Sequence, residues 1–263
     1  MRYRVLVALP LVCALLFALA LALAGEGARP LVVRAGNESG KALALLGCLA
    51  AALAFERGEY LRRAWLLSGT CLLLLLARDA LLLLGREGGA LIDHVRVGLS
   101  FVANLSAVIG TLMIARAWRV AGMELPGSWG LRGAAIAVAF GIALALAGPS
   151  AYVNLGGALR GDPRGLIGLA SDLGDILSTT LLAPVLLTAI AVRGGLLRWP
   201  WGLATASLFS WLLYDTFVTV LGEVPHHGST FGLVGEGFRV LACSLQCCAG
   251  FAQRFVVRGP PPA

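Results

Sequence analysis

Predominantly apolar segments recur along the chain with only short polar connections between them, and this pattern constrains the fold more than any other feature. A transmembrane helix needs about 20 apolar residues to cross the hydrocarbon core of a bilayer. Eight segments reach or approach that length, at residues 5–24, 41–55, 64–84, 94–116, 131–148, 172–192, 201–221 and 231–252. The sequence therefore predicts one all-α domain over residues 1–263, a membrane bundle of eight transmembrane helices.

The composition favours lipid as the solvent for most of the chain. Of the 263 residues, 59% are hydrophobic and 13% are charged, with a mean hydropathy of +0.86. A soluble domain needs far more polar surface. The net charge of +7 comes from basic residues spread through short connections, with no basic face that interleaves aromatic residues. We therefore expect the lipid bilayer as a partner and no nucleic acid.

The first apolar segment and the basic residues bear on topology. Residues 1–24 have the basic start and apolar run of a signal peptide, but the run is long for one, so we expect a retained helix. Its cleavage would leave seven spans in the same orientation. With the N-terminus inside, the inner helix ends hold twelve arginines and the outer ends seven basic residues. The inner interface also receives five tryptophans, Trp65, Trp118, Trp129, Trp199 and Trp201. Both signals predict cytoplasmic termini and a multi-pass inner-membrane protein.

Two connections are predicted to be long. Residues 25–40 are polar and are expected to form a loop, which places Lys41, the only lysine, at the start of the shortest span. Residues 149–171 are glycine-rich and begin with Pro149, which predicts a loop that can hold a short re-entrant segment. With Lys41 at a helix end, the bundle lacks an internal lysine for a retinal Schiff base. No nucleotide-binding fingerprint appears either, so we expect no cofactor.

Five of the predicted helices carry polar residues at spacings that a helix brings to one face, whereas the spans 5–24, 41–55 and 131–148 do not. The five stripes are Ser68, Cys71, Arg78 and Asp79; Arg96, Ser100, Asn104 and Thr111; Ser171, Asp172, Asp175, Ser178 and Thr179; Ser207, Ser210, Tyr214 and Asp215; and Glu236, Arg239, Cys243 and Gln246. Charged groups inside a bilayer face protein or water rather than lipid. We therefore expect the stripes to face one another.

The charged members of these stripes fall in the outer halves of their spans, with more carboxylates than arginines. This excess predicts a water-filled acidic pocket, open to the outside, that binds a small polar or cationic ligand. The candidate ligand-binding residues are Arg78, Asp79, Asn104, Asp172, Asp175, Tyr214, Asp215, Glu236 and Arg239. Alternatively, the same groups form structural salt bridges that hold the helices together, as Glu236 and Arg239 can at a spacing of three residues.

The histidines and cysteines are the candidate metal ligands of the chain. His94, His226 and His227 all belong to the outer side, and three such ligands could hold a zinc ion with an open position. The adjacent pair His226 and His227 is awkward for joint ligation, so the metal site is a minor hypothesis. The six cysteines all fall in apolar segments, where small packing residues are expected.

Two short fragments resemble the intramembrane aspartyl proteases. That family uses Tyr-Asp on one helix and Gly-x-Gly-Asp on the next, and its two carboxylates share a proton. Tyr214-Asp215 and Asp172-Leu-Gly-Asp175 are similar to these motifs. Here the order of the motifs is reversed, Asp172 replaces the first glycine, and no Pro-Ala-Leu follows. The resemblance covers six residues and implies a hydrolase that would use Asp175 and Asp215.

Three functions therefore follow from the sequence. The leading one is an outward-facing protein that senses or transports a small polar or cationic ligand. The second is a membrane-embedded hydrolase, which would use either the histidines with a metal or the aspartate pair. The third is a structural or assembly subunit of a membrane complex.

Overall fold

The computed structural model describes residues 2–84, 90–120, 122, 124–191, 195–220 and 230–259, and these residues form eight α-helices. The prediction of an all-helical chain is confirmed. The helices are α1 (Arg2–Leu23), α2 (Arg29–Ala52), α3 (Tyr60–Leu84), α4 (Ala90–Val120), α5 (Trp129–Leu159), α6 (Pro163–Ala191), α7 (Arg198–Val220) and α8 (Thr230–Arg258).

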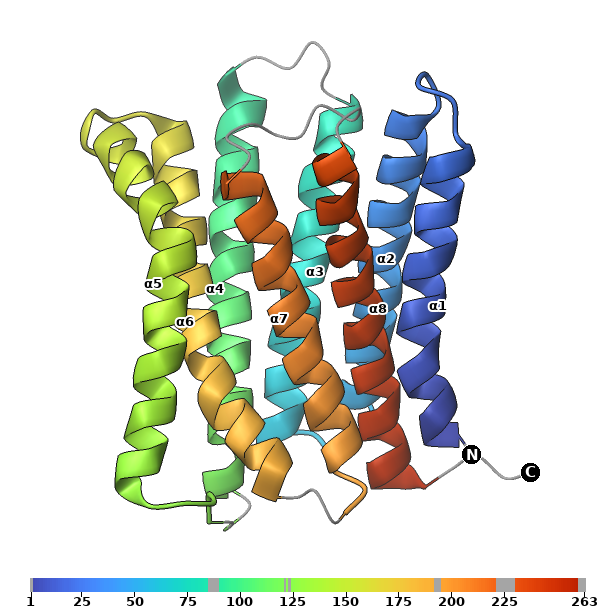
Figure 1. Cartoon of the computed structure of the whole chain (residues 1–263), viewed down its shortest axis with the longest axis vertical. Coiled ribbons are helices and arrows are strands. Elements are labelled where there is room, and N and C mark those ends of the chain that lie inside the picture. Colours follow the sequence, from blue (N-terminus) through green and yellow to red (C-terminus); the bar gives the residue numbers. More distant parts are fainter. Residues whose placement is uncertain are drawn as a thin grey trace.

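The eight helices run up and down, roughly parallel to one axis (Figure 1). α1 begins and α8 ends at the same end of the bundle, called here the terminal end; the other is the distal end. Six helices form a closed ring, because α2 packs on α3, α3 on α4, α4 on α6, α6 on α7, α7 on α8, and α8 on α2. Outside this ring, α1 packs mainly on α8 and α5 mainly on α6.

The helix α2 begins much earlier than predicted. It starts at Arg29 with Pro30 in its first turn, where the missing amide hydrogen of proline costs nothing. The expected loop over residues 25–40 and the expected start at residue 41 are therefore wrong. Polar side chains hide the helical pattern in the sequence, but the buried positions recur at helical spacing, at Val33, Asn37, Gly40, Lys41 and Ala44.

The loop predicted over residues 149–171 is also wrong. α5 continues to Leu159, and α6 starts at Pro163 after a turn in which Gly161 has a φ of 77°. Pro149 lies inside α5, as prolines in transmembrane helices can. The glycines in this region serve helix packing, because a Cβ on Gly168 would overlap the side-chain amide of Asn154 on α5. The result is a long hairpin in place of a loop.

Six helices, α1, α3, α4, α5, α6 and α8, are long and apolar enough to cross a membrane. The outside of the bundle carries many exposed large apolar side chains, on α2 as well as on these six. Those on α2 are Leu31, Leu43, Leu46 and Leu49. An apolar surface of this extent is expected against lipid and not against water. These features suggest a membrane protein.

The helices α2 and α8 of the ring approach each other closely. A Cβ on Gly47 would lie 2.6 Å from the Cα of Cys247, and a Cβ on Gly250 would overlap the carbonyl oxygen of Gly47. Small residues let membrane helices approach until their backbones touch. The buried neighbours of this contact are also small: Ala44, Cys48, Ala51, Cys243, Cys248 and Ala249.

The core near the terminal end contains two tryptophans that the sequence placed at the membrane interface. Trp65 and Trp201 are only 3% and 5% exposed, so both pack inside the bundle and not on its outer surface. Trp65 packs in a cluster shared by α2, α3, α7 and α8, and Trp201 packs in a second cluster with α3, α4 and α6. Together these clusters fill the ring at the terminal end.

Candidate functional site

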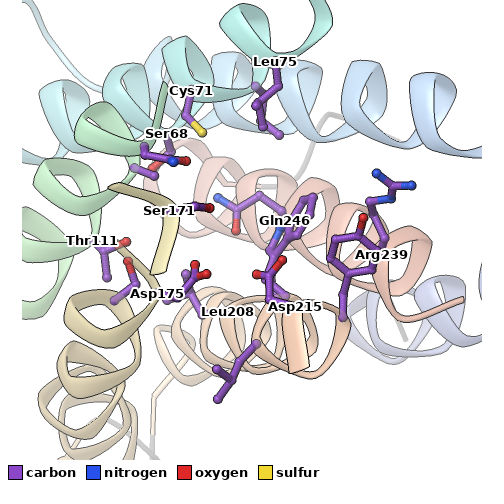
Figure 2. Close-up of a pocket in the computed structure, with 18 of the residues that line it drawn as sticks. Ser68, Cys71, Leu75, Thr111, Ser171, Asp175, Leu208, Asp215, Arg239 and Gln246 are labelled. Carbon is purple, nitrogen blue, oxygen red and sulfur yellow. The ribbon is translucent and has the colours of Figure 1, made fainter. Parts of the chain in front are cut away.

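A cavity of about 340 Å³ lies inside the six-helix ring. Each ring helix contributes to its wall, and Figure 2 shows side chains from several helices converging on one space. The polar and charged lining residues are Lys41, Ser68, Arg78, Ser100, Asn104, Thr111, Ser171, Asp175, Ser178, Thr179, Ser207, Tyr214, Asp215, Arg239 and Gln246. The polar stripes of five helices therefore do face one another across a common cavity.

The cavity is elongated along the bundle axis. On α4 it is lined from Ser100 to Thr111, a rise of about 16 Å at 1.5 Å per residue. Its distal part is charged, with Arg78, Asp215 and Arg239. The part nearer the terminal end is lined by neutral polar residues and by apolar ones. They are Ser68, Leu72, Thr111, Ser207, Leu208 and Gln246.

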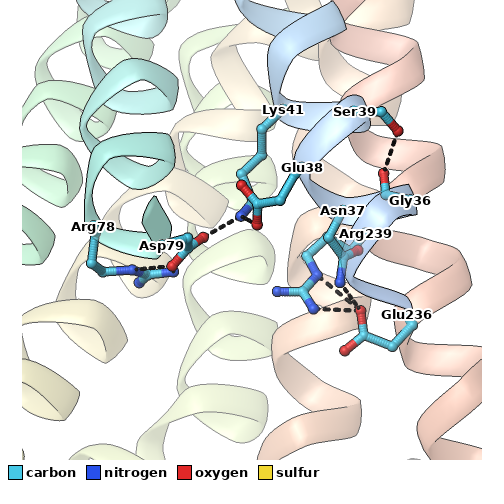
Figure 3. Close-up of polar contacts among 9 residues, drawn as sticks. All are labelled: Gly36, Asn37, Glu38, Ser39, Lys41, Arg78, Asp79, Glu236 and Arg239. Carbon is cyan, nitrogen blue, oxygen red and sulfur yellow. Dashed lines mark hydrogen bonds and ion pairs between the residues drawn. The ribbon is translucent and has the colours of Figure 1, made fainter. Parts of the chain in front are cut away.

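Lys41 joins α2 to α3 through a chain of charges that we call the lysine clamp, Glu38, Lys41, Asp79 and Arg78 (Figure 3). The Lys41 ammonium donates to Glu38 Oε1 at 2.8 Å and to Asp79 Oδ2. The Arg78 guanidinium donates to Asp79 Oδ1 at 2.7 Å. Lys41 is 2% exposed and lies in the middle of α2, so its predicted place at a helix end is wrong. The exclusion of a retinal Schiff base assumed that no lysine lies inside the bundle, so that exclusion no longer holds.

A second chain, the arginine clamp, joins α2, α8 and α7 through Asn37, Glu236, Arg239 and Tyr214. Figure 3 shows its first three residues. The Asn37 amide donates to Glu236 Oε2 at 2.8 Å, and Arg239 Nε donates to the same oxygen at 3.0 Å. The Arg239 guanidinium also lies 4.6 Å from the ring centre of Tyr214. The pairing of Glu236 with Arg239 is the one the sequence offered as a structural alternative.

Two carboxylates near these clamps take no part in either of them. Lys41, Arg78 and Arg239 balance Glu38, Asp79 and Glu236, three positive charges against three negative ones. Asp175 on α6 and Asp215 on α7 both line the cavity, and neither makes a hydrogen bond or ion pair with a described residue. Formally, the cavity wall therefore carries two negative charges that form no ion pair with a described cation, although Arg239 lies near enough to Asp215 to act on its charge.

Asp172 differs from its neighbour Asp175 because it faces α5 and does not line the cavity. Its carboxylate accepts a hydrogen bond of 2.8 Å from the side-chain amide of Asn154, which also donates to Ser150 at 3.2 Å. The predicted span 131–148 itself carries no polar stripe, but α5 extends to Leu159 and so supplies both Ser150 and Asn154. For the second helix the expectation of no polar stripe is wrong, because Asn37 and Lys41 are buried polar residues of α2.

The structure thus divides the nine candidate ligand-binding residues into three groups. Six line the cavity: Arg78, Asn104, Asp175, Tyr214, Asp215 and Arg239. Asp79 and Glu236 lie behind it as ion-pair partners, and Asp172 belongs to the α5–α6 contact. Sequence reasoning missed Lys41 and Trp211 as lining residues. A helical reading of residues 29–41 would have placed Lys41 on the buried face.

The proposed metal ligands do not come together among the described residues. His94 is exposed on α4, and His226 and His227 lie outside the described residues. Within the described ranges, no group of three histidine, cysteine or acidic side chains is placed to hold a metal ion. Asp175 and Asp215, the carboxylates of the aspartyl protease resemblance, line one cavity. The hydrolase alternative stays a prediction.

Comparisons of the chain with protein-family models, with curated proteins and with solved structures find no match.

Proposed function

We propose that all eight helices span the inner membrane, with both termini in the cytoplasm and α1 retained. The shortest helix, α1, has 22 residues, which at 1.5 Å per residue is about 33 Å and enough for a hydrocarbon core of about 30 Å. Lys41 of α2 and Ser207, Tyr214 and Asp215 of α7 line the cavity inside the ring, so these polar residues do not oppose insertion. Packing of Phe17 and Leu21 against Val33 and Val240 supports the retention of α1.

The orientation is supported by the basic residues of the described chain. The terminal end of the bundle carries Arg57, Arg62, Arg63, Arg116, Arg119, Arg132, Arg198, Arg254 and Arg258. The distal end carries Arg29, Arg34, Arg96 and Arg160. The described arginines thus number nine at the terminal end and four at the distal end, and Lys41, which the sequence counted at an outer end, lies inside the bundle. The positive-inside rule then puts the terminal end in the cytoplasm and the charged part of the cavity towards the outside.

In this orientation the protein binds a small organic cation in its cavity. The observation that carries the proposal is the pair Asp175 and Asp215, which line the cavity while the neighbouring cations are engaged by other carboxylates. A carboxylate at that depth is costly unless it is paired or hydrated. A bound ammonium or guanidinium group would supply the missing charge. Trp211, Leu208 and Leu212 offer apolar surface for the rest of the ligand.

Binding measurements on the purified protein in lipid nanodiscs test this function with matched probes. Choline and guanidinium are compared with 3,3-dimethylbutanol and urea, which have similar shapes without the charge. We expect at least one cation to bind and its neutral counterpart to bind at least tenfold more weakly, a difference of about 1.4 kcal/mol.

Substitutions at the two free carboxylates give the first prediction. Asp215→Asn and Asp175→Asn should each weaken cation binding at least tenfold while the protein still folds, because each removes a charge that has no protein partner. Asp172→Asn is the matched control on the same helix, since that carboxylate faces Asn154, and it should change the affinity less than threefold. Equal losses in all three variants, or no binding of either cation, would contradict the proposal.

A further inference from the structure

A second, smaller void lies in the ring on the terminal side of the cavity. Its volume is about 10 Å³, which is close to the space that one water molecule needs. The lining residues are Leu61, Trp65, Ile114, Pro200, Trp201, Ala204 and Gln253. The void is therefore built by α3, α4, α7 and α8, four of the helices that also form the cavity.

Helix register places this void directly below the cavity. On α4, Thr111 lines the cavity and Ile114 lines the void. The same spacing of three residues separates Ser68 from Trp65 on α3, and Ser207 from Ala204 on α7. Three residues are less than one helical turn, a rise of about 5 Å. On these three helices the cavity and the void are therefore consecutive layers of one interior path.

Gln253 makes this lower layer polar. Its side chain lines the void, is 2% exposed, and has no hydrogen bond with any described residue. A buried amide without a partner is unfavourable, and buried water commonly supplies the missing hydrogen bonds. Gln253 also follows Gln246 by seven residues, or two helical turns, so both amides lie on the face that α8 turns towards the ring interior.

The void lies close to the terminal end of the bundle. Leu61 is the second residue of α3 and Pro200 the third of α7, so two of the lining residues lie in the first turn of their helices. The large side chains in this layer are Trp65 and Trp201, both buried. A change in the position of these two rings would connect the cavity to the cytoplasmic end.

We propose that the protein is a transporter of the cation that binds in its cavity. Trp65 and Trp201 form its cytoplasmic gate, and the Gln253 amide is the polar contact that the cation, with its water, makes inside that gate. This inference rests on the proposed function and adds a direction to it. The cation passes from Asp175 and Asp215 towards Gln253 and leaves at the terminal end.

Choline flux tests the gate, because this permanently charged ion does not cross lipid unaided. The protein is reconstituted in vesicles of phosphatidylcholine and phosphatidylglycerol loaded with radiolabelled choline, and efflux is compared with that from protein-free vesicles. Choline binding and thermal stability are measured on the same preparations. We expect wild-type efflux well above the background, and a drop of at least tenfold for Gln253→Leu with choline affinity within twofold of wild type.

A second variant keeps the test independent of how Gln253→Leu folds. Ala204→Val keeps Gln253 but fills the void from α7, and it should also lower efflux at least fivefold without loss of binding. Trp65→Ala opens the gate layer and should raise efflux several-fold. Unchanged efflux in both blocking variants would overturn the gate, and so would wild-type protein that binds choline without any flux above background. Either result would overturn the gate and leave the proposed cation binding unaffected. Cation binding is tested separately, by the nanodisc measurement.

Discussion

Replacement of Lys41 by methionine is expected to lower the free energy of unfolding by about 3 kcal/mol, the low end of the cost of breaking a buried ion pair. Lys41 is 2% exposed and bridges Glu38 on its own helix to Asp79 on α3. Methionine fills similar space without the charge. Asp79 would keep Arg78 as a partner, which limits the loss. The measurement is reversible denaturation in mixed micelles, followed by circular dichroism.

A double variant separates charge from packing at this site. Lys41→Met with Asp79→Asn removes both members of the pair between α2 and α3, so only Glu38, whose side chain is 32% exposed, is left without its ammonium partner. The double variant should recover more than half of the stability lost in Lys41→Met. A loss below about 1 kcal/mol in the single variant would match an exposed ion pair instead and would contradict the buried position of Lys41.

Among the described glycines, Gly250 is the position where replacement by alanine is expected to destabilise the protein most. The new Cβ would overlap the backbone carbonyl of Gly47 on α2, and a backbone cannot turn aside as a side chain can. The two helices must separate along their whole contact. We expect a loss of about 3 kcal/mol, the upper end of ordinary overpacking, and a smaller yield of folded protein.

The matched control is on the same helix. A Cβ on Gly237 would have no neighbour within 4 Å. Gly237→Ala should therefore be neutral or raise stability by up to about 1 kcal/mol, because alanine favours helices over glycine. Both variants are compared by thermal unfolding in the same detergent. Similar stability of the two variants would show that α2 and α8 are farther apart than described.

The sequence was most informative where apolar residues repeat without interruption. The spans at 64–84 and 201–221 lie close to the helices α3 and α7, since apolar residues run through both segments. It was least informative at α2 and at the α5–α6 hairpin. In α2 the charges turn inward and satisfy one another, and at Pro149 a helix continues through a residue that usually ends one. Tertiary packing determines the structure of both segments, and a local sequence pattern carries no information about tertiary packing.

For the candidate site too, the sequence predicted some features and not others. Helical spacing alone places Arg78, Asn104, Asp175, Asp215 and Arg239 on interior faces, and all five line the cavity. Spacing could not separate Asp172 from Asp175, because the two lie three residues apart on α6 and face different neighbours. It also could not show that Lys41 of α2 pairs with Asp79, or that Asp175 and Asp215 have no ion-pair partner among the described residues, since both depend on how the helices pack.

The most direct test of the central claim is an experimental structure of the protein in lipid with choline bound. Our account predicts the choline ammonium inside the six-helix ring, with the carboxylates of Asp175 and Asp215 within about 4–6 Å, the range over which opposite charges stabilise each other. Choline bound outside the ring, or either carboxylate in an ion pair with an arginine or lysine of the protein, would contradict it.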